Sequence, residues 1–151
     1  MVFSNSRKIV LNQKMLTSQG NEIEVVTTYK YLGFMIDDHI SFKTHIQNLV
    51  KKLKLKLGFY FRNKSCFSLE ARRRLVEATF LPVLDYGDLL YMNASAHCLH
   101  MLDTVYHGAL RFITNSRALT HHCTLYSRVN WPSLFMRRLD RKSTRLNPVT
   151  L

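Results

Sequence analysis

The spacing of apolar residues changes near Ser41, and this change constrains the fold more than any other feature of the sequence. After Ser41 the apolar positions recur every three or four residues, which places them on one face of a long helix. Before it, short runs of β-branched and aromatic residues alternate with turn-forming residues, as in small sheets. We therefore predict an α+β protein, in which a small N-terminal antiparallel sheet is followed by a bundle of four to five helices. The apolar positions of the first helix are Phe42, Ile46, Leu49, Val50, Leu53, Leu57 and Tyr60.

Residues 1–40 are expected to form the sheet. A turn at Gln19–Asn21 divides this region, because glycine and asparagine favour tight turns. Gly33 falls inside the last expected strand, where it predicts a kink or a bulge. The expected strands are Met1–Phe3, Lys8–Leu11, Ile23–Thr28 and Tyr29–Ile36.

Residues 41–139 are expected to form the helical domain. Pro82 lies inside the second helix and should kink or split it near Leu81, because proline lacks the backbone N–H that the helix needs. Residues 140–151 lose the apolar pattern, so we expect a disordered or artefactual tail there. The expected helices are Phe42–Phe61, Leu69–Tyr91, His97–Thr114, Leu119–Arg128 and Leu134–Leu139.

The composition is strongly basic, with 22 Lys and Arg against 10 Asp and Glu, which gives a formal net charge of +12. An excess of this size favours phosphate-rich partners, either nucleic acid or an anionic membrane surface. Three cysteines form no disulfide framework. Neither a signal-peptide pattern nor an apolar run of about 18 residues is present, so we expect an intracellular protein, nuclear or cytoplasmic, that is neither secreted nor membrane-spanning.

The basic residues are clustered on and after the first predicted helix. On an amphipathic helix the apolar residues pack inward, and the ammonium groups then project as a stripe that contacts phosphates without reading bases. The same pattern is typical of a helix lying on anionic lipid. We favour nucleic acid, because the other helices need this apolar face for their core. The expected nucleic-acid contacts are Lys51, Lys52, Lys54, Lys56, Arg62, Lys64, Arg72, Arg73 and Arg74.

Three clusters with possible catalytic or metal chemistry have simpler explanations. Paired aspartates such as Asp37–Asp38 can hold Mg²⁺, but acidic residues are also favoured just before a helix, where Asp38 or Ser41 could act as the N-cap. His97–His100 and His121–Cys123 lack the usual spacing of zinc ligands, so we expect helix-terminal histidines and no metal. Since neither a nucleophile–base pair nor a phosphate loop can be identified, we predict no catalytic residues, no cofactor and no small-molecule substrate.

Several short motifs occur together in a characteristic order. They are Met1–Ser4, Thr28–Asp37, His45–Ile46 with the lysine-rich helix, Leu75–Gly87, Thr120–Cys123, Leu125–Tyr126, Trp131–Leu134 and Arg137–Arg138. This ordered set, which extends from about residue 1 to residue 139, resembles the C-terminal part of the reverse transcriptase of non-LTR (LINE-type) retrotransposons.

The resemblance implies a division of roles along the chain. Residues 1–40 would form a hairpin that grips the primer, with Tyr31, Leu32 and Gly33 as the primer-grip residues. The helices would form the thumb, which holds an RNA–DNA hybrid or a DNA duplex by its backbone through the lysines named above. The catalytic aspartates and the Mg²⁺ ions of this RNA-directed DNA polymerase belong to a palm domain that would precede this sequence. We therefore expect a truncated fragment that binds nucleic acid without sequence preference and is no enzyme on its own.

Two alternatives stay open. The chain could be an interaction module, or a non-functional remnant of the retrotransposon. In addition, residues 45–86 are similar to the N-terminal helical segment of the AlkB-homologue family, which includes tRNA methyltransferases and enzymes that repair alkylated DNA. That family needs an iron-binding set of residues or a glycine-rich methyl-donor loop for catalysis, and the sequence contains neither.

Overall fold

The computed structural model describes residues 18–21 and 26–146 of the chain. Contacts divide the chain into two compact units, Met1–His45 and Ile46–Leu151. The first contains a two-stranded antiparallel sheet and the second a helical bundle, so the predicted α+β class is confirmed. Of the expected strands, Met1–Phe3 and Lys8–Leu11 lie outside the described residues.

The sheet is a tight hairpin of β1 (Thr28–Tyr31) and β2 (Phe34–Asp37), paired so that Tyr31 faces Phe34. The two residues between the strands, Leu32 and Gly33, both have positive φ (46° and 87°). Such a turn twists in the same sense as the strands that it joins, which is why glycine is favoured in it. Our expectation of one strand with a bulge at Gly33 was therefore wrong, because the chain reverses there.

The other N-terminal predictions have mixed outcomes. The turn at Gln19–Asn21 is confirmed, and Gly20 in it has a φ of 81°. Of the expected strand Ile23–Thr28, residues 23–25 lie outside the described part of the chain, and only Thr28 belongs to β1.

The predicted first helix is confirmed as α1 (Lys43–Arg62). Its start is held by Ser41, whose Oγ accepts from the N–H of Lys43 (3.3 Å), and by Asp37, whose Oδ1 accepts from the N–H of Phe42 (3.0 Å). Burial would raise the pKa of the Asp37 carboxyl, but hydrogen bonds from Ser41 and from Phe42 outweigh it and hold the pKa below its usual value. Asp38 instead accepts from the N–H of its neighbour His39 (3.1 Å). Of the two expected N-cap residues, Ser41 thus holds the helix start, together with Asp37, whereas Asp38 contacts His39.

The second predicted helix is interrupted and ends early. After a short 3₁₀ turn, η1 (Lys64–Cys66), it comprises α2 (Leu69–Leu75), a π-helical segment η2 (Val76–Phe80) and α3 (Leu81–Asp85). The N–H of Leu81 bonds to the carbonyl of Val76, five residues back, just before Pro82, which confirms the predicted irregularity. The helix stops at Asp85 and not at Tyr91. The chain turns there, with Gly87 at a φ of 62°, and the buried Tyr91 hydroxyl donates to the carbonyl of Leu84 (3.2 Å).

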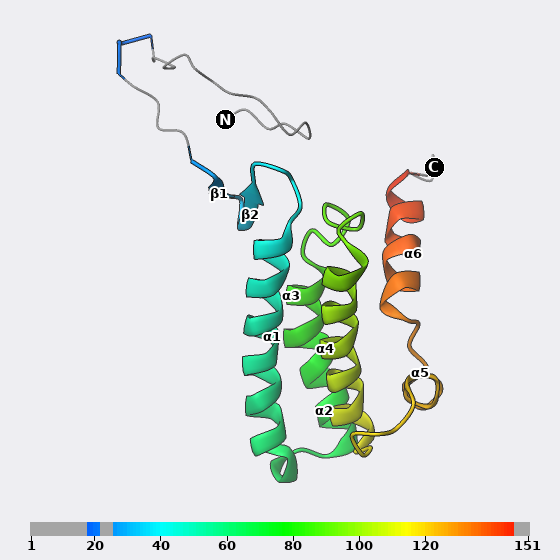
Figure 1. The fold of residues 1–151 in the computed structure, drawn as a ribbon. Coiled ribbons are helices and arrows are strands. Elements are labelled where there is room, and N and C mark those ends of the chain that lie inside the picture. The colour runs from blue at the N-terminus through cyan, green and yellow to red at the C-terminus, as the bar shows by residue number, and fades with distance from the viewer. Residues whose placement is uncertain (1–17, 22–25, 147–151) are drawn as a thin grey trace, which may run out of the picture. The chain divides into compact units, whose positions relative to one another are not determined.

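The remaining helices are α4 (Ala96–Thr114), α5 (His122–Val129) and α6 (Leu134–Leu146). Helix α4 ends at Asn115 and α5 ends at Asn130, and both asparagines have a left-handed backbone conformation. In Figure 1, α4 lies in the middle of the bundle, with α1 on one side and α6 on the other.

The Tyr106 hydroxyl of α4 donates to the carbonyl of Pro132 (3.0 Å), and burial raises its pKa to about 12, so it stays a donor. The largest fully buried side chains of the core are Tyr91, Tyr106, Phe80, Phe112, Ile46 and Leu53.

The last helix corrects our prediction of a disordered or artefactual tail from residue 140. Helix α6 continues to Leu146, and residues 147–151 lie outside the described part of the chain. Arg137 contacts Asp85 (2.8 Å), and Arg141 contacts both Asp85 and Asp88 (2.7 Å to Asp88). Asp88 is almost completely buried. Charged contacts therefore hold this helix where the apolar pattern stops.

We predict opposite outcomes for two helical glycines. Replacing Gly58 by Ala should raise the free energy of unfolding by about 0.5–1 kcal/mol, because the new methyl group meets only the end of Arg62 at 3.8 Å. A methyl group at Gly108 would lie 2.9 Å from Cδ1 of Leu57, which is buried. Gly108→Ala should therefore be less stable than Gly58→Ala by about 1–3 kcal/mol. Urea denaturation followed by circular dichroism checks this, and equal gains for both variants would contradict the packing.

We also predict that Arg141→Ala lowers the free energy of unfolding by about 1–3 kcal/mol, because it leaves the buried Asp88 and the half-buried Asp85 with fewer partners. Lys142→Ala removes the same charge from an exposed neighbour and is the matched control. Urea denaturation of both variants measures the difference. If both variants unfold at the same urea concentration, residues 140–146 are not held as described.

Candidate nucleic-acid interface

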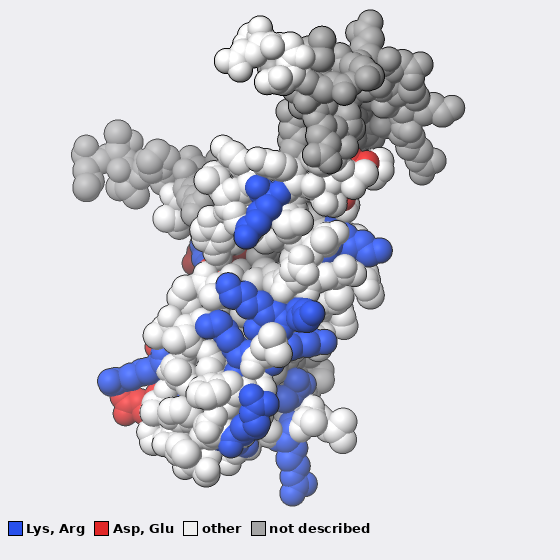
Figure 2. Space-filling model, turned by 90° about the vertical axis from the view of Figure 1, so that its left-hand side faces the viewer, with Lys and Arg blue, Asp and Glu red and all other residues white. Residues whose placement is uncertain are grey.

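The basic residues gather on the outward face of α1. Figure 2, which views the bundle from the side of α1, shows lysine and arginine side chains spread over this face. The helix carries five lysines and Arg62 but no Asp or Glu. Lys51, Lys52 and Lys54 are exposed and Lys56 is half-buried, and within the described residues no ion pair involves them. The predicted lysines thus lie on one helix with their charges unpaired among the described residues, and we call the exposed surface of α1 the α1 basic face.

The predicted residues beyond Lys56 divide into two groups. Arg62, in the last turn of α1, is exposed and extends this face. Lys64, in η1, is half-buried, with its ammonium group 5.9 Å from the centre of the Phe61 ring. The arginines of α2 differ from both.

Arg72, Arg73 and Arg74 all have partners within the bundle. Arg72 is only 9% exposed, and its Nη2 donates to the carbonyl of Lys64 (2.7 Å), while its guanidinium lies 5.7 Å from the centre of the Phe112 ring. The structure therefore gives Arg72 a role in packing, which does not favour the predicted nucleic-acid contact there. Arg73 and Arg74 are more exposed, but they pair with Glu77 (3.0 Å) and Glu70 (2.6 Å) respectively. These acidic neighbours reduce the field that a phosphate would meet.

Apolar side chains lie among the lysines of the α1 basic face, and the sequence reasoning missed them. Leu55 and Phe59 are 69% and 51% exposed, and they follow Lys51 at intervals of four residues, on the same outward face. A shallow hollow of about 370 Å³ lies beside Leu55. Both residues lie outside the apolar stripe that the helical spacing predicts to be buried, and this position could have identified them from the sequence. The residues that line the hollow are Gln47, Val50, Lys51, Lys54 and Leu55.

The three predicted primer-grip residues meet at the turn of the hairpin. Tyr31 is 57% exposed and Leu32 is 70% exposed, beside Gly33. Tyr29, two residues earlier on β1, is 50% exposed. The hairpin therefore presents aromatic and apolar surface to solvent, of the kind on which bases can stack.

His45 braces this hairpin from the first turn of α1. Its Nδ1 accepts from the N–H of Met35 (3.4 Å), and its ring lies 4.8 Å from the ring of Phe34. Burial of the imidazole lowers its pKa from the usual 6.5.

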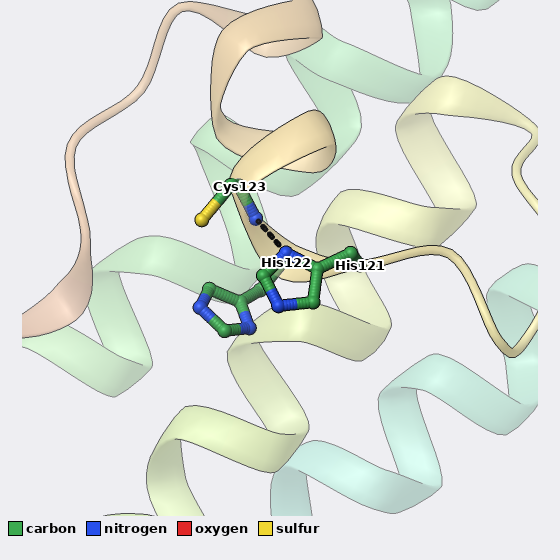
Figure 3. Close-up of side chains that lie close together, drawn as sticks. All are labelled: His121, His122 and Cys123. Atoms are coloured by element: carbon green, nitrogen blue, oxygen red, sulfur yellow. Dashed lines mark hydrogen bonds between the residues drawn. The ribbon is translucent and has the colours of Figure 1, made fainter.

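The two histidine–cysteine clusters differ in geometry. In the first, Cys98 is buried in the core, whereas His97 and His100 are exposed. In the second, at the start of α5, the ligand atoms of His121, His122 and Cys123 all lie within 4.8 Å of one another and all three side chains are exposed (Figure 3). His121 is also the N-cap of α5, and its Nδ1 accepts from the N–H of Cys123 (3.4 Å).

No family model, curated protein or solved structure matches this chain. Within residues 18–21 and 26–146, none of the helices combines the length and the apolar character that crossing a membrane requires.

We predict that acid loosens the hairpin through His45. Because burial lowers its pKa in the folded state, the stabilisation is complete above about pH 6.5 and is lost as the pH falls below that value. The hydrogen-exchange protection factor of the Met35 amide should therefore be constant above about pH 6.5 and fall as the pH is lowered below that value. In His45→Gln, which keeps an acceptor but does not titrate, it should stay constant. Unchanged protection in the unmodified protein would contradict this role.

Proposed function

We propose that this protein binds the phosphate backbone of an RNA–DNA hybrid or a DNA duplex through the α1 basic face. One observation carries the proposal, namely that a solvent-facing helix of 20 residues holds six cationic side chains and no acidic one. Such a helix attracts a polyanion, and its lysines have no ion-pair partner among the described residues that would have to be displaced first.

The dimensions of the face fit a duplex. Lys51 and Arg62 are separated by about 16 Å along the helix axis, which corresponds to roughly ten phosphate charges of a double helix. Lysine and arginine contacts to phosphate position a protein on a duplex without selecting a sequence. The resemblance to a reverse transcriptase thumb supports the same kind of partner, and the exposed Tyr31 and Leu32 of the hairpin correspond in it to the primer grip.

The apolar residues on the face add a contact that charge alone does not supply. Phe59 is exposed beside the lysines, and aromatic rings stack on unpaired bases. We therefore expect the protein to prefer a duplex that ends in a short single-stranded overhang over a blunt one.

The proposal is tested by measuring the affinity for a labelled RNA–DNA hybrid between about 50 and about 200 mM salt. Replacing Lys51, Lys52 and Lys54 by Ala should weaken binding at low salt. It should also lower the slope of log K against log salt by about 0.9 for each lost contact, roughly 2.7 in all. Removing charge from a surface that makes no phosphate contact does not change this slope.

The matched control is the triple variant in which Arg117, Arg128 and Lys142 are replaced by Ala. These exposed residues lie in the α4–α5 loop, in α5 and in α6, across the bundle from α1 in Figure 1, and their loss changes the net charge equally. Equal salt slopes for the two triple variants would overturn the proposal. Binding to vesicles of anionic lipid with no measurable affinity for the hybrid would also overturn it and would assign the face to a membrane surface.

A further inference from the structure

The start of α5 gathers three side chains that are typical metal ligands. Two imidazoles and one thiol, from the consecutive residues His121, His122 and Cys123, bring their ligand atoms within 4.8 Å of one another. In Figure 3 both rings and the sulfur lie around the first turn of the helix, and all three side chains are exposed. Consecutive residues rarely converge in this way along a strand or inside a helix, and here the N-cap position of His121 turns its ring back over the helix start.

Neighbouring aromatic residues restrict the position of His122. The ring of His107, from α4, stacks against it with centroids 5.5 Å apart, and the ring of Tyr126 lies 5.9 Å away. His107 is itself held, because its Nε2 forms a hydrogen bond of 2.6 Å with the Tyr126 hydroxyl. The imidazole of His122 therefore has a support from a second helix, although its outer edge remains exposed.

We propose that His121, His122 and Cys123 bind one divalent transition-metal ion of the zinc class. Thiolate and imidazole ligands select such ions over Mg²⁺ and Ca²⁺, which prefer oxygen. This site is separate from the α1 basic face, and it does not rest on the function proposed above.

The site needs only small movements to close around an ion. Tetrahedral zinc with ordinary bond lengths places its nitrogen and sulfur ligands roughly 3.4–3.6 Å apart. The side chains are exposed, so rotation about their own bonds can bring the ligand atoms to that separation. The Sγ of Cys123 lies in the first turn of α5, next to both imidazoles. If His121 bound the ion through Nδ1, the hydrogen bond that it would lose is a long one, at 3.4 Å. A fourth position faces solvent and is open to water.

The test uses untagged, metal-free protein titrated with Co²⁺, whose thiolate complexes have a charge-transfer absorption that imidazole and carboxylate complexes lack. We expect one equivalent of Co²⁺ to give this absorption and one equivalent of Zn²⁺ to remove it. Cys123→Ser should abolish the absorption, and replacing both His121 and His122 by Ala should weaken Co²⁺ binding at least tenfold.

Two matched controls make the result specific. Cys66→Ser removes the other exposed thiol, and replacing both His97 and His100 by Ala removes two exposed histidines from α4, so neither should change the titration. Circular dichroism of every variant checks that the bundle stays folded, and Cys123→Ser, which leaves the N-cap side chain of His121 in place, is the decisive variant. An absorption that survives Cys123→Ser, that is lost in Cys66→Ser, or that fails to saturate at one equivalent would overturn the proposal.

Discussion

Burial of the apolar stripe of α1 against α4 is the interaction on which the rest of the structure depends. Gly108 of α4 leaves room for Leu57 of α1. One turn along each helix, the ring of Phe112 stacks on Tyr60, with centroids 5.3 Å apart, and meets the edge of Phe61 at 5.6 Å. A helix that turns one face inward must turn the opposite face outward, so this packing is also what presents the lysines as a surface. The orientation of α1 therefore produces both the core and the candidate interface.

The regular parts of the fold could be predicted because local periodicity determines them. Helix α1 begins and ends one residue later than predicted, and α4 begins one residue earlier and ends where expected. The predictions were wrong where a long-range contact or the type of turn determines the local structure. Gly33 suits a bulge as well as a hairpin turn, and only the pairing of Tyr31 with Phe34 distinguishes them. The end of α3 and the continuation of α6 both depend on contacts between arginines and aspartates more than fifty residues apart, which no local pattern reveals.

The same distinction applies to the candidate sites. The exposure of Lys51, Lys52 and Lys54 follows from their place on the helix, so the α1 basic face was predictable. The burial of Arg72 was not, because it depends on Phe112 from another helix. The cluster at His121–Cys123 was visible in the sequence but was set aside because its spacing is not that of known zinc motifs. Its convergence comes from a helix N-cap, where the backbone leaves helical geometry and the side chain folds back.

The pairing of Asp85 and Asp88 with α6 has a consequence for how the chain acquires its structure during synthesis. The two carboxylates leave the ribosome about fifty residues before Arg137 and Arg141, which neutralise them. Until α6 is made, the turn after α3 holds acidic groups that cannot be buried without a counter-charge, so this end of the bundle must stay hydrated and open. Docking of α6 then both supplies the positive charge and excludes the water. The nascent chain should therefore assemble α1, α2 and α4 first and close the region around Tyr91 in a separate, final step.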